Sequence, residues 1–438
     1  MLGFAEHPWR HPAALRAVGM TALRETCGLP PYDRGMLDTV RPIAEAIRAR
    51  GGRAIAVGGF VRDSLLGRPE SDAKDLDVEV FGLTAPELES VLRGFGEVLA
   101  FGRSFPVMRV VGLEIDFSLA RGADFAEAAR RRDLTIHAIG LDPLSGEILD
   151  PLGGRADLAA RVLRAADARY FGSDPLRGLR VMQIAARFAM EPDAELVALC
   201  AALDLSDLPG ERLRVEFDKL LLGAQQPSRG LEVLRRTHLL RFFPELAAPG
   251  GDVWAHTERA LDAAALLRTG GAGDSPLMYA VLCRDFGAAA ARRFLERLRA
   301  PNALIDQVCA LVEHHRAPAQ LERDGADAAA YRRLARRLDE AGVSPALLER
   351  VARADHLGRA TPDASARQFP ERFLALIAQH AIRVGSTQDV VWGRHLLARG
   401  LEPGPEFARI LARCREVQDE TGWSDPEQIL SRALGKSA

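Results

Sequence analysis

The sequence predicts an α+β protein, in which a head of strands and helices is followed by a neck, body and tail made of helices. Residues 54–57 form a short apolar run next to glycine, which is typical of a buried strand. In residues 74–81, charged and apolar residues alternate with period two, as in a half-buried strand. After about Ser206, stretches rich in alanine, leucine and arginine are interrupted by proline and glycine, so helices are expected from there on.

The first elements of the chain lead to a glycine turn. Residues 1–35 are expected to be an N-terminal extension, and residues 36–50 a helix. After the strand at 54–57, Gly58 and Gly59 precede a short helix that is predicted over residues 61–66. The free N–H groups of such a turn can hold the oxygen atoms of an anion, although a plain turn would have the same sequence.

Acidic residues follow this turn on the second predicted strand. Asp75, Asp77 and Glu79 alternate with apolar residues and therefore share one face of the strand. Two neighbouring carboxylates repel each other, and a bound divalent cation removes that repulsion. Asp75 and Asp77 are therefore candidate metal ligands, although Asp-x-Asp on a solvated strand face is common without any function.

Taken together and in this order, these motifs resemble the nucleotidyltransferase superfamily. The run Gly58-Gly59-Phe60-Val61-Arg62-Asp63, with Leu65-Leu66-Gly67 and Lys74-Asp75-Leu76-Asp77, resembles its branch of bacterial tRNA nucleotidyltransferases (CCA-adding enzymes) and poly(A) polymerases. Four further segments between residues 50 and 245 resemble later motifs of this branch, in the same order: 131–138, 150–154, 173–180 and 211–221. The resemblance implies a nucleotidyltransferase head with a mixed sheet, ahead of the helical neck, body and tail.

The resemblance also implies a reaction and a cofactor. A Mg²⁺-dependent transferase of this type adds CMP and AMP, from CTP and ATP, to the 3′ end of tRNA without a nucleic-acid template. In nucleotidyl transfer a 3′-hydroxyl attacks an α-phosphate, and two metal ions held by carboxylates assist the attacking and leaving oxygens. Asp75 and Asp77 are the expected ligands. Asp116, on another alternating strand, is either a third carboxylate or a solvated strand residue.

Several residues are expected to bind the incoming nucleotide. Arg62 can pair with phosphate oxygens, whereas Asp63 is expected to support the helix start or a neighbouring arginine. The resemblance implies that Arg132 and Asp133 contact the ribose and phosphates, and His137 stands where the family usually has asparagine. The complete predicted nucleotide-binding set is Gly58, Gly59, Arg62, Arg132, Asp133, His137, Asp174, Arg177 and Arg180.

Asp174 and Arg177 are the candidates for base selection. They resemble the family's Glu-Asp-x-x-Arg motif, with Ser173 in place of the glutamate. If a helix begins at Pro175, the two residues lie on one face of it. A carboxylate accepts and a guanidinium donates hydrogen bonds, which suits cytosine and adenine but not uracil or guanine. Asp174 is equally an ordinary N-cap, and both roles can hold. Arg180 could reach a phosphate or lie on the surface.

A short segment precedes the Arg132 motif. The strand region ends at Arg121, and only residues 122–130 separate it from Arg131. Residues 126–132 are expected to be helical. Family members that add the complete CCA end usually carry a longer flexible loop here. The resemblance therefore suggests an enzyme that adds only the two cytidines.

A weaker resemblance covers the region 251–320. His256, the pair Arg284-Asp285 and the pair His314-His315 resemble the metal ligands of an HD-type phosphohydrolase. Such a domain needs a His-Asp doublet, and Arg284 puts a cation where a ligand should be. A degenerate, structural helical unit is therefore expected, and at most one of the two adjacent histidines could be a ligand.

Composition bounds the remaining possibilities. Among 438 residues, 47% are hydrophobic and 27% charged, and no apolar run approaches a membrane span. The first residues lack the features of a signal peptide, and the five cysteines contain no Cys-x-x-Cys, so a cytoplasmic location is expected. The net charge of −2 does not itself indicate RNA binding. Arginines crowd the predicted neck, where they form either an RNA-binding face or a salt-bridged surface: Arg155, Arg161, Arg164, Arg169, Arg177, Arg180 and Arg187.

These expectations define a domain order and competing functions. The predicted order is an extension (1–35), a catalytic head (36–148), a neck with nucleotide-selecting and RNA-binding elements (149–250) and a degenerate HD-like body and tail (251–438). The alternatives to a tRNA 3′-end transferase are a poly(A) polymerase, a catalytically silent RNA-binding paralogue and an HD phosphohydrolase. Ser173, His137 and the short segment favour a silent paralogue, whereas the paired Asp75 and Asp77 argue against it. The sequence leaves the oligomeric state open.

Overall fold

The computed structural model describes residues 34–67, 76–101, 107–246, 251–359, 369–379 and 389–435. Asp75 and nearly all of the predicted N-terminal extension lie outside these ranges. Within them, no helix is long and apolar enough to cross a membrane. The chain forms two compact units, residues 1–181 with 189–204 and residues 182–188 with 205–438. The predicted head lies in the first unit with the first part of the predicted neck.

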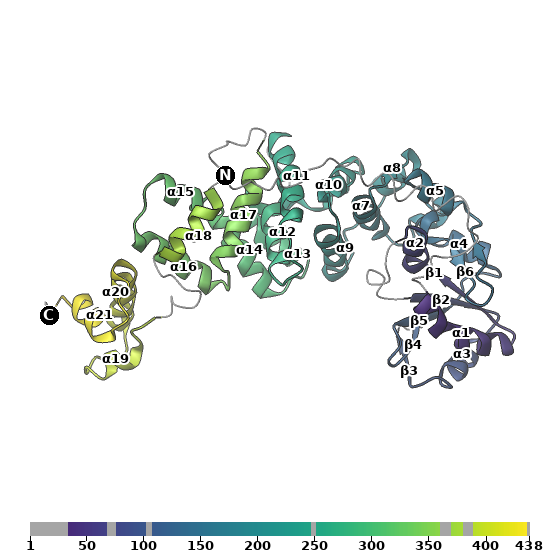
Figure 1. The fold of residues 1–438 in the computed structure, drawn as a ribbon, viewed down its shortest axis with the longest axis horizontal. Coiled ribbons are helices and arrows are strands. Elements are labelled where there is room, and N and C mark those ends of the chain that lie inside the picture. The colour runs from purple at the N-terminus through teal and green to yellow at the C-terminus, as the bar shows by residue number, and fades with distance from the viewer. Residues whose placement is uncertain are drawn as a thin grey trace, which may run out of the picture. The chain divides into compact units, whose positions relative to one another are not determined.

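A seven-stranded mixed sheet forms the centre of the first unit (Figure 1), with strand order β3-β4-β5-β2-β1-β6-β7. The pair β2–β5 is parallel and the other pairs are antiparallel, so the predicted mixed sheet is confirmed. The strands are β1 (Arg53–Val57), β2 (Leu76–Phe81), β3 (Val98–Phe101), β4 (Val107–Val110), β5 (Ile115–Leu119), β6 (Gly140–Leu141) and β7 (Ile148–Leu149).

Helices pack on this sheet and extend the first unit. In α1, Val40, Ile43 and Ile47 are almost fully buried, and their helical spacing gives the apolar stripe that contacts β1 and α3. A small parallel sheet, β8 (Val162–Leu163) with β9 (Glu191–Pro192), lies in the neck, which was predicted to be helical. The sequence did not predict this sheet, because two-residue strands are too short to give a sequence pattern. The helices are α1 (Arg34–Ala49), α2 (Gly59–Leu65), α3 (Ala85–Leu92), α4 (Phe125–Arg130), η4 (Thr135–His137), α5 (Gly154–Ala160), α6 (Ala168–Phe171), α7 (Arg177–Phe188), which continues into the second unit, and α8 (Ala194–Ala201).

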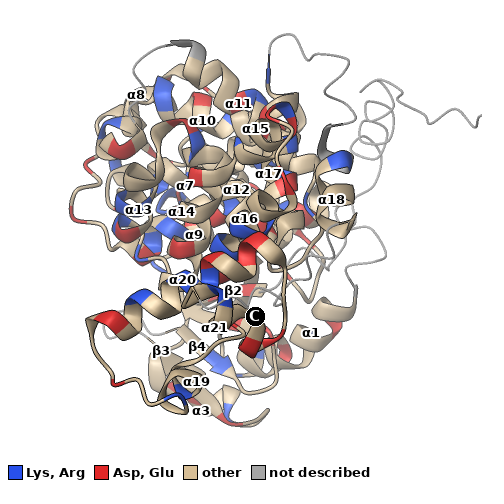
Figure 2. Ribbon diagram, turned by 90° about the vertical axis from the view of Figure 1, so that its left-hand side faces the viewer, with Lys and Arg blue, Asp and Glu red and all other residues tan. Residues whose placement is uncertain are grey.

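The second unit is helical in its described residues, as predicted. Phe217, Phe243 and Phe294 meet edge to face in its core, with ring centroids 5.1–6.0 Å apart. Figure 2 shows basic and acidic residues intermingled on its helices, and ion pairs such as Arg336 with Asp419 (2.9 Å) join them. Its first helices are α9 (Gly210–Gly223), α10 (Pro227–Arg236), η5 (Leu239–Phe242), η6 (Pro244–Leu246), α11 (Gly251–Leu266), α12 (Asp274–Cys283) and η7 (Arg284–Phe286). The later ones are α13 (Ala288–Arg297), α14 (Asn302–His314), α15 (Ala317–Arg323), α16 (Ala328–Glu340), α17 (Pro345–Leu357), α18 (Phe369–Gln379), α19 (Gly393–Leu397), α20 (Pro405–Thr421) and α21 (Pro426–Ala433).

Candidate active site

The glycine turn between β1 and α2 lies directly against a carboxylate and an arginine. Gly58 has φ 78°, a left-handed conformation that favours glycine. A Cβ atom at Gly58 would lie 3.1 Å from Asp77 Oδ2 and 3.7 Å from Arg132 Nη1. Gly58 therefore provides both the backbone conformation and the space that bring the chain close to these two charged groups.

Strand register places Asp77 beside both the turn and Asp116. Asp77 is opposite Val57, the last residue of β1, and it is paired with Asp116 on the parallel strand β5. Residues paired in this way point to the same face of a sheet. On β2 the side chains of Leu76, Val78 and Val80 are buried, whereas Asp77 is exposed and Glu79 half-buried. The structure thus puts three acidic side chains on one face beside the glycine turn, and Asp75 lies outside the described residues.

Asp116 is held by an arginine that the sequence did not reveal. Arg109, opposite Asp116 on β4, donates from Nε to Oδ1 (2.6 Å) and from Nη2 to Oδ2 (2.9 Å). This two-pronged contact fixes the plane of the carboxylate. Each carboxylate oxygen keeps a further lone pair, so the contact leaves Asp116 able to bind a metal ion.

Glu79 and Arg132 form a second pair next to Asp77. Arg132 Nη2 donates to Glu79 Oε1 over 2.6 Å, and both side chains are largely buried. Among the described residues, Glu79 Oε2 and Arg132 Nε are buried without a hydrogen-bond partner. Buried polar atoms are rarely left without partners in folded proteins, so these two atoms mark a place where a ligand could complete the contacts.

A buried polar chain runs from α2 to α7 behind the turn. Arg62 binds Asp63 through two hydrogen bonds of 2.8 and 2.9 Å, and its Nη1 donates to His137 Nε2 over 2.6 Å. Because arginine only donates, His137 carries its proton on Nδ1, which donates to Asp133 Oδ1 over 2.9 Å. Arg180 Nη1 completes the chain by donating to Asp133 Oδ2 over 2.8 Å.

This series of hydrogen bonds gives several predicted nucleotide-binding residues partners within the protein. Arg62 is only 6% exposed, and Asp63 supports this neighbouring arginine, one of the two roles predicted for it. Arg180 is bound to Asp133, so it does not extend as an isolated surface arginine. His137, in the position of the family's asparagine, connects Arg62 to Asp133 although the two ends are far apart in the sequence.

The charges in this chain are set by burial and by the pairing. Burial acts to raise the pKa of Asp133, but His137 and Arg180 outweigh it and hold that pKa well below its usual value. Burial lowers the pKa of His137, and the opposing attraction of Asp133 only partly offsets it. At neutral pH we therefore expect an ionised Asp133 and a neutral His137.

Lowering the pH should destabilise the first unit through His137. The folded protein holds the pKa of His137 below the unfolded value of about 6.5, so below that pH the unfolded chain binds more protons. The contribution of His137 to the free energy of unfolding is therefore complete above about pH 6.5, and it falls as the pH is lowered below that value. Thermal unfolding of the wild type and of His137→Asn at pH 7.5 and 5.5 checks this. The variant should lose less stability on acidification, and equal losses would contradict the role of His137.

The segment that precedes α7 differs from the prediction. The helix begins at Arg177, two residues after the predicted start at Pro175, because Pro175 and Leu176 form a tighter turn with a bond from Gly178 N to Pro175 O (3.2 Å). Asp174 therefore lies before the helix, and its Oδ1 accepts from the N–H of Leu176 over 3.1 Å. The structure thus shows the capping role of Asp174, and the N–H of Arg177 donates to Asp174 O over 3.1 Å, which keeps the two residues in one turn.

Arg177 is oriented by main-chain oxygens. Its Nη1 donates to Tyr170 O (2.7 Å) and its Nη2 to Arg131 O (2.6 Å). Burial lowers the pKa of Arg177, and Asp133 and Asp174 act in the opposite direction. The guanidinium is thus fixed beside the residue that precedes Arg132 and Asp133 in the chain.

Two of the remaining neck arginines are paired with acidic residues. Arg164 contacts Asp157 and Asp193, and Arg169 contacts Asp167. For these two arginines the structure favours the salt-bridged surface over a free basic face. The segment before Arg131 contains a helix, α4 (Phe125–Arg130), close to the predicted residues 126–132. It starts after Asp124, whose Oδ1 accepts from the N–H of Glu127 over 2.9 Å.

Comparisons with known proteins identify the family of this chain. The family model described as the poly A polymerase head domain matches residues 106–164, and a model for a probable RNA- and SrmB-binding site of polymerase A matches residues 187–248. The Multifunctional CCA protein of Halorhodospira halophila is 35% identical over 318 residues, which are 59% of this chain and 72% of that protein. The chain belongs to the tRNA nucleotidyltransferase family.

Other members of the tRNA nucleotidyltransferase family give similar results. The Multifunctional CCA protein of Haemophilus ducreyi is 36% identical over 269 residues, which are 53% of this chain and 63% of that protein. The CCA-adding enzyme of Bacillus stearothermophilus in complex with CTP has a TM-score of 0.69 at 22% identity, over 93% of this chain and 98% of that one. The Thermotoga maritima CCA-adding enzyme complexed with tRNA gives 0.62 at 19% identity, over 93% and 99%. At these identities the structural likeness establishes the fold.

Proposed function

We propose that this chain is a tRNA 3′-end nucleotidyltransferase that adds CMP, AMP or both from CTP and ATP without a nucleic-acid template. The observation that carries this proposal is the approach of the Gly58 turn to Asp77, which is itself in register with Asp116. Main-chain N–H groups of a glycine turn suit a triphosphate, and carboxylates beside it suit the metal ions that accompany one. The relatives named as CCA proteins support the same activity.

The acidic face fits a divalent metal ion. Asp77, Asp116 and Glu79 offer carboxylate oxygens, the ligands that Mg²⁺ prefers, and Glu79 Oε2 is buried without a hydrogen-bond partner among the described residues. We assign Asp77 and Asp116, together with Asp75, as the residues that would hold Mg²⁺. When bound, the ion would assist attack by the tRNA 3′-hydroxyl and stabilise the leaving pyrophosphate.

The protein's own residues would bind and select the nucleotide. Arg132, whose Nη1 faces Gly58, is suited to the phosphates, and its buried Nε still lacks a partner among the described residues. Asp174 and Arg177 would select cytosine and adenine through the accepting and donating groups that these bases require. Since main-chain oxygens fix Arg177 from one side, its orientation does not depend on the glutamate that Ser173 replaces.

We further propose that synthesis stops after two cytidines. The segment between β5 and Arg131 is short and is largely taken up by the capped helix α4, whereas enzymes that add the complete end usually have a longer loop there.

The free cysteines among the described residues, Cys200, Cys283, Cys309 and Cys414, suit a protein of the reducing cytoplasm.

Extension of defined tRNAs tests both proposals. Transcripts that end at the discriminator base, after C or after CC are incubated with Mg²⁺ and each nucleotide singly, and with CTP and ATP together. We expect growth to CC and no further. Growth to CCA would contradict the restriction to CC but support the transferase. AMP added only after CC would mark an A-adding enzyme, long adenosine tails a poly(A) polymerase, and no growth on any substrate a silent paralogue.

A further inference from the structure

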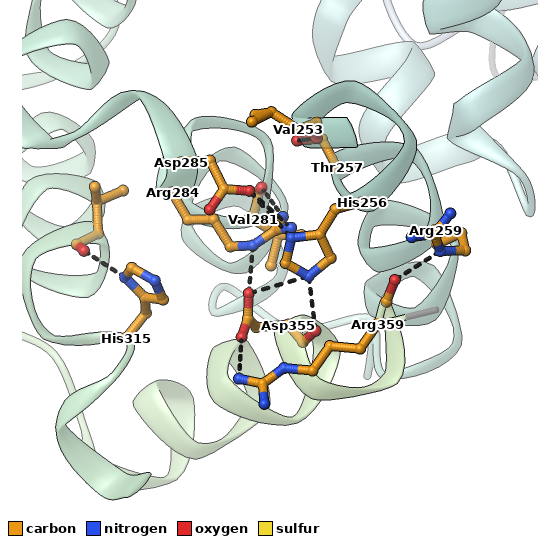
Figure 3. A network of polar contacts seen from close by, with 12 residues as sticks. Val253, His256, Thr257, Arg259, Val281, Arg284, Asp285, His315, Asp355 and Arg359 are labelled. Atoms are coloured by element: carbon orange, nitrogen blue, oxygen red, sulfur yellow. Dashed lines mark hydrogen bonds and ion pairs between the residues drawn. The ribbon is translucent and has the colours of Figure 1, made fainter. Parts of the chain in front are cut away.

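A second group of metal-ligand side chains lies in the second unit, far from the glycine turn in the sequence. His256 of α11, Asp285 of η7 and Asp355 of α17 have ligand atoms within 4.8 Å of one another. Figure 3 shows the three side chains converging from these separate helices. We call this group the HD-like centre. The sequence pointed to His256 and Asp285, whereas Asp355, 99 residues beyond His256, carried no recognisable signal.

The adjacent histidines predicted as possible ligands do not join this group. His315 Nδ1 contacts the main-chain oxygen of Val312 over 2.7 Å, at the end of α14 (Figure 3). His314 is the last residue of α14 and is also not part of the three-residue group. The candidate ligands that the structure brings together are therefore one histidine and two aspartates.

Arg284 fills the centre of this group. Its side chain is 0% exposed, and its Nε donates to Asp355 Oδ1 over 2.6 Å. Its Nη2 forms an ion pair with Asp285 Oδ2 over 3.0 Å, although neither atom has a hydrogen-bond partner among the described residues. Its Nη1 donates to the main-chain oxygen of Val281 over 2.8 Å, which fixes the guanidinium in place. The cation thus bridges the same two carboxylates that a metal ion would bridge (Figure 3).

Both ring nitrogens of His256 face oxygen atoms of the chain, and Nε2 makes a hydrogen bond. Its Nδ1 lies 3.3 Å from Asp285 Oδ2, and its Nε2 lies 3.1 Å from the main-chain oxygen of Asp355. A histidine that binds a metal ion directs one unprotonated nitrogen at the ion. Here both nitrogens are directed at oxygen atoms.

The charges around the HD-like centre also disfavour a divalent cation. Besides Arg284, Arg359 Nη2 lies 3.5 Å from Asp355 Oδ2 and Arg316 Nη2 lies 4.0 Å from Asp285 Oδ1. Both carboxylates are therefore already neutralised by groups of the chain itself.

We propose that Arg284 replaces the metal ion of the HD-like centre. Its guanidinium is a permanent internal cation that neutralises Asp285 and Asp355 and ties η7 and α17 to His256 of α11. The centre is then a metal-independent clamp between helices, and it has lost the hydrolytic role that a metal ion would support. This inference is independent of the transferase function proposed for the first unit.

The variant Arg284→His tests this exchange, because it removes the internal cation and restores a His-Asp doublet. The full-length protein is titrated with Mn²⁺ and melted in EDTA and in Mn²⁺. The variant should bind one Mn²⁺ per chain more than the wild type. In EDTA it should melt roughly 6–20 °C lower, because two buried carboxylates lose their counter-charge, and Mn²⁺ should recover much of this shift.

Two matched variants assign the effect to this site. His256→Ala in the Arg284→His background should abolish the extra Mn²⁺, whereas metal bound in the first unit is unaffected. Arg292→His makes the same exchange at an exposed ion pair with Asp306 and should change neither property. An Arg284→His protein that gains no Mn²⁺, or that melts like the wild type in EDTA, would overturn the proposal. If that variant does not fold, Mn²⁺ binding by the wild type is compared with that of the single variant His256→Ala. A Mn²⁺ ion that the wild type binds and the single variant does not would show that Arg284 does not replace the metal.

Discussion

Replacing Asp77 by asparagine should reduce nucleotide incorporation by about 10³-fold or more while tRNA binding stays nearly unchanged. The substitution keeps the size of the side chain beside Gly58 but removes the charge that faces the glycine turn. Metal-assisted charge stabilisation contributes several kcal/mol to such transfers, and each 1.36 kcal/mol corresponds to a factor of ten in rate. Single-turnover incorporation of CMP, with tRNA binding measured separately, gives both quantities.

The matched control for this variant is Glu89→Gln on α3, which removes one negative charge from an exposed ion pair with Arg93. It should leave incorporation within about twofold of the wild type, because exposed ion pairs contribute little. An Asp77→Asn protein that retained a tenth of the wild-type rate would show that the metal site has been assigned to the wrong residues. Loss of tRNA binding in parallel with activity would instead point to misfolding of the head.

The sequence predicted those parts of the fold that depend on local pattern. Alternation of charged and apolar residues predicted β2, and the structure has Asp77 and Glu79 on the open face with Val78 and Val80 buried. The mixed sheet and the helical second unit follow from the same periodic signals and from the family resemblance. The helix α7 starts at Arg177, two residues after the start considered at Pro175, because a proline after aspartate fits either a helix start or a turn.

The partners of the site residues could not be predicted, because they depend on tertiary contacts between distant segments. Arg62 and His137 are 75 residues apart, and their hydrogen bond follows from the packing of α2 against η4. Arg109 reaches Asp116 only because of the register between β4 and β5. Single residues with ordinary neighbours in the sequence, such as Arg109 and Asp355, carry no local signal of such roles.

Replacing Arg177 by alanine should weaken the preference for CTP and ATP over UTP and GTP by about 100-fold or more. The guanidinium is the donor that we assign to base selection, and its two contacts to Tyr170 O and Arg131 O hold it in one orientation. A site whose polar groups match one base rejects a mismatched base strongly, because buried groups are then left unpaired. Removing the donor abolishes that penalty for the wrong bases. The measurement is the ratio of kcat/KM for CTP to that for UTP with a tRNA that accepts C.

This ratio separates selection from folding, since a smaller amount of active enzyme changes both values equally. Arg169→Ala is the control, because Arg169 is 71% exposed and pairs with Asp167 in the same unit, and its ratio should equal that of the wild type. Arg177→Lys keeps the charge but cannot make the two-pronged contact, so we expect a ratio between those of the alanine variant and the wild type. If Arg177→Ala lost activity but kept the wild-type ratio, the arginine would support the backbone at Tyr170 and Arg131 and would not read the base.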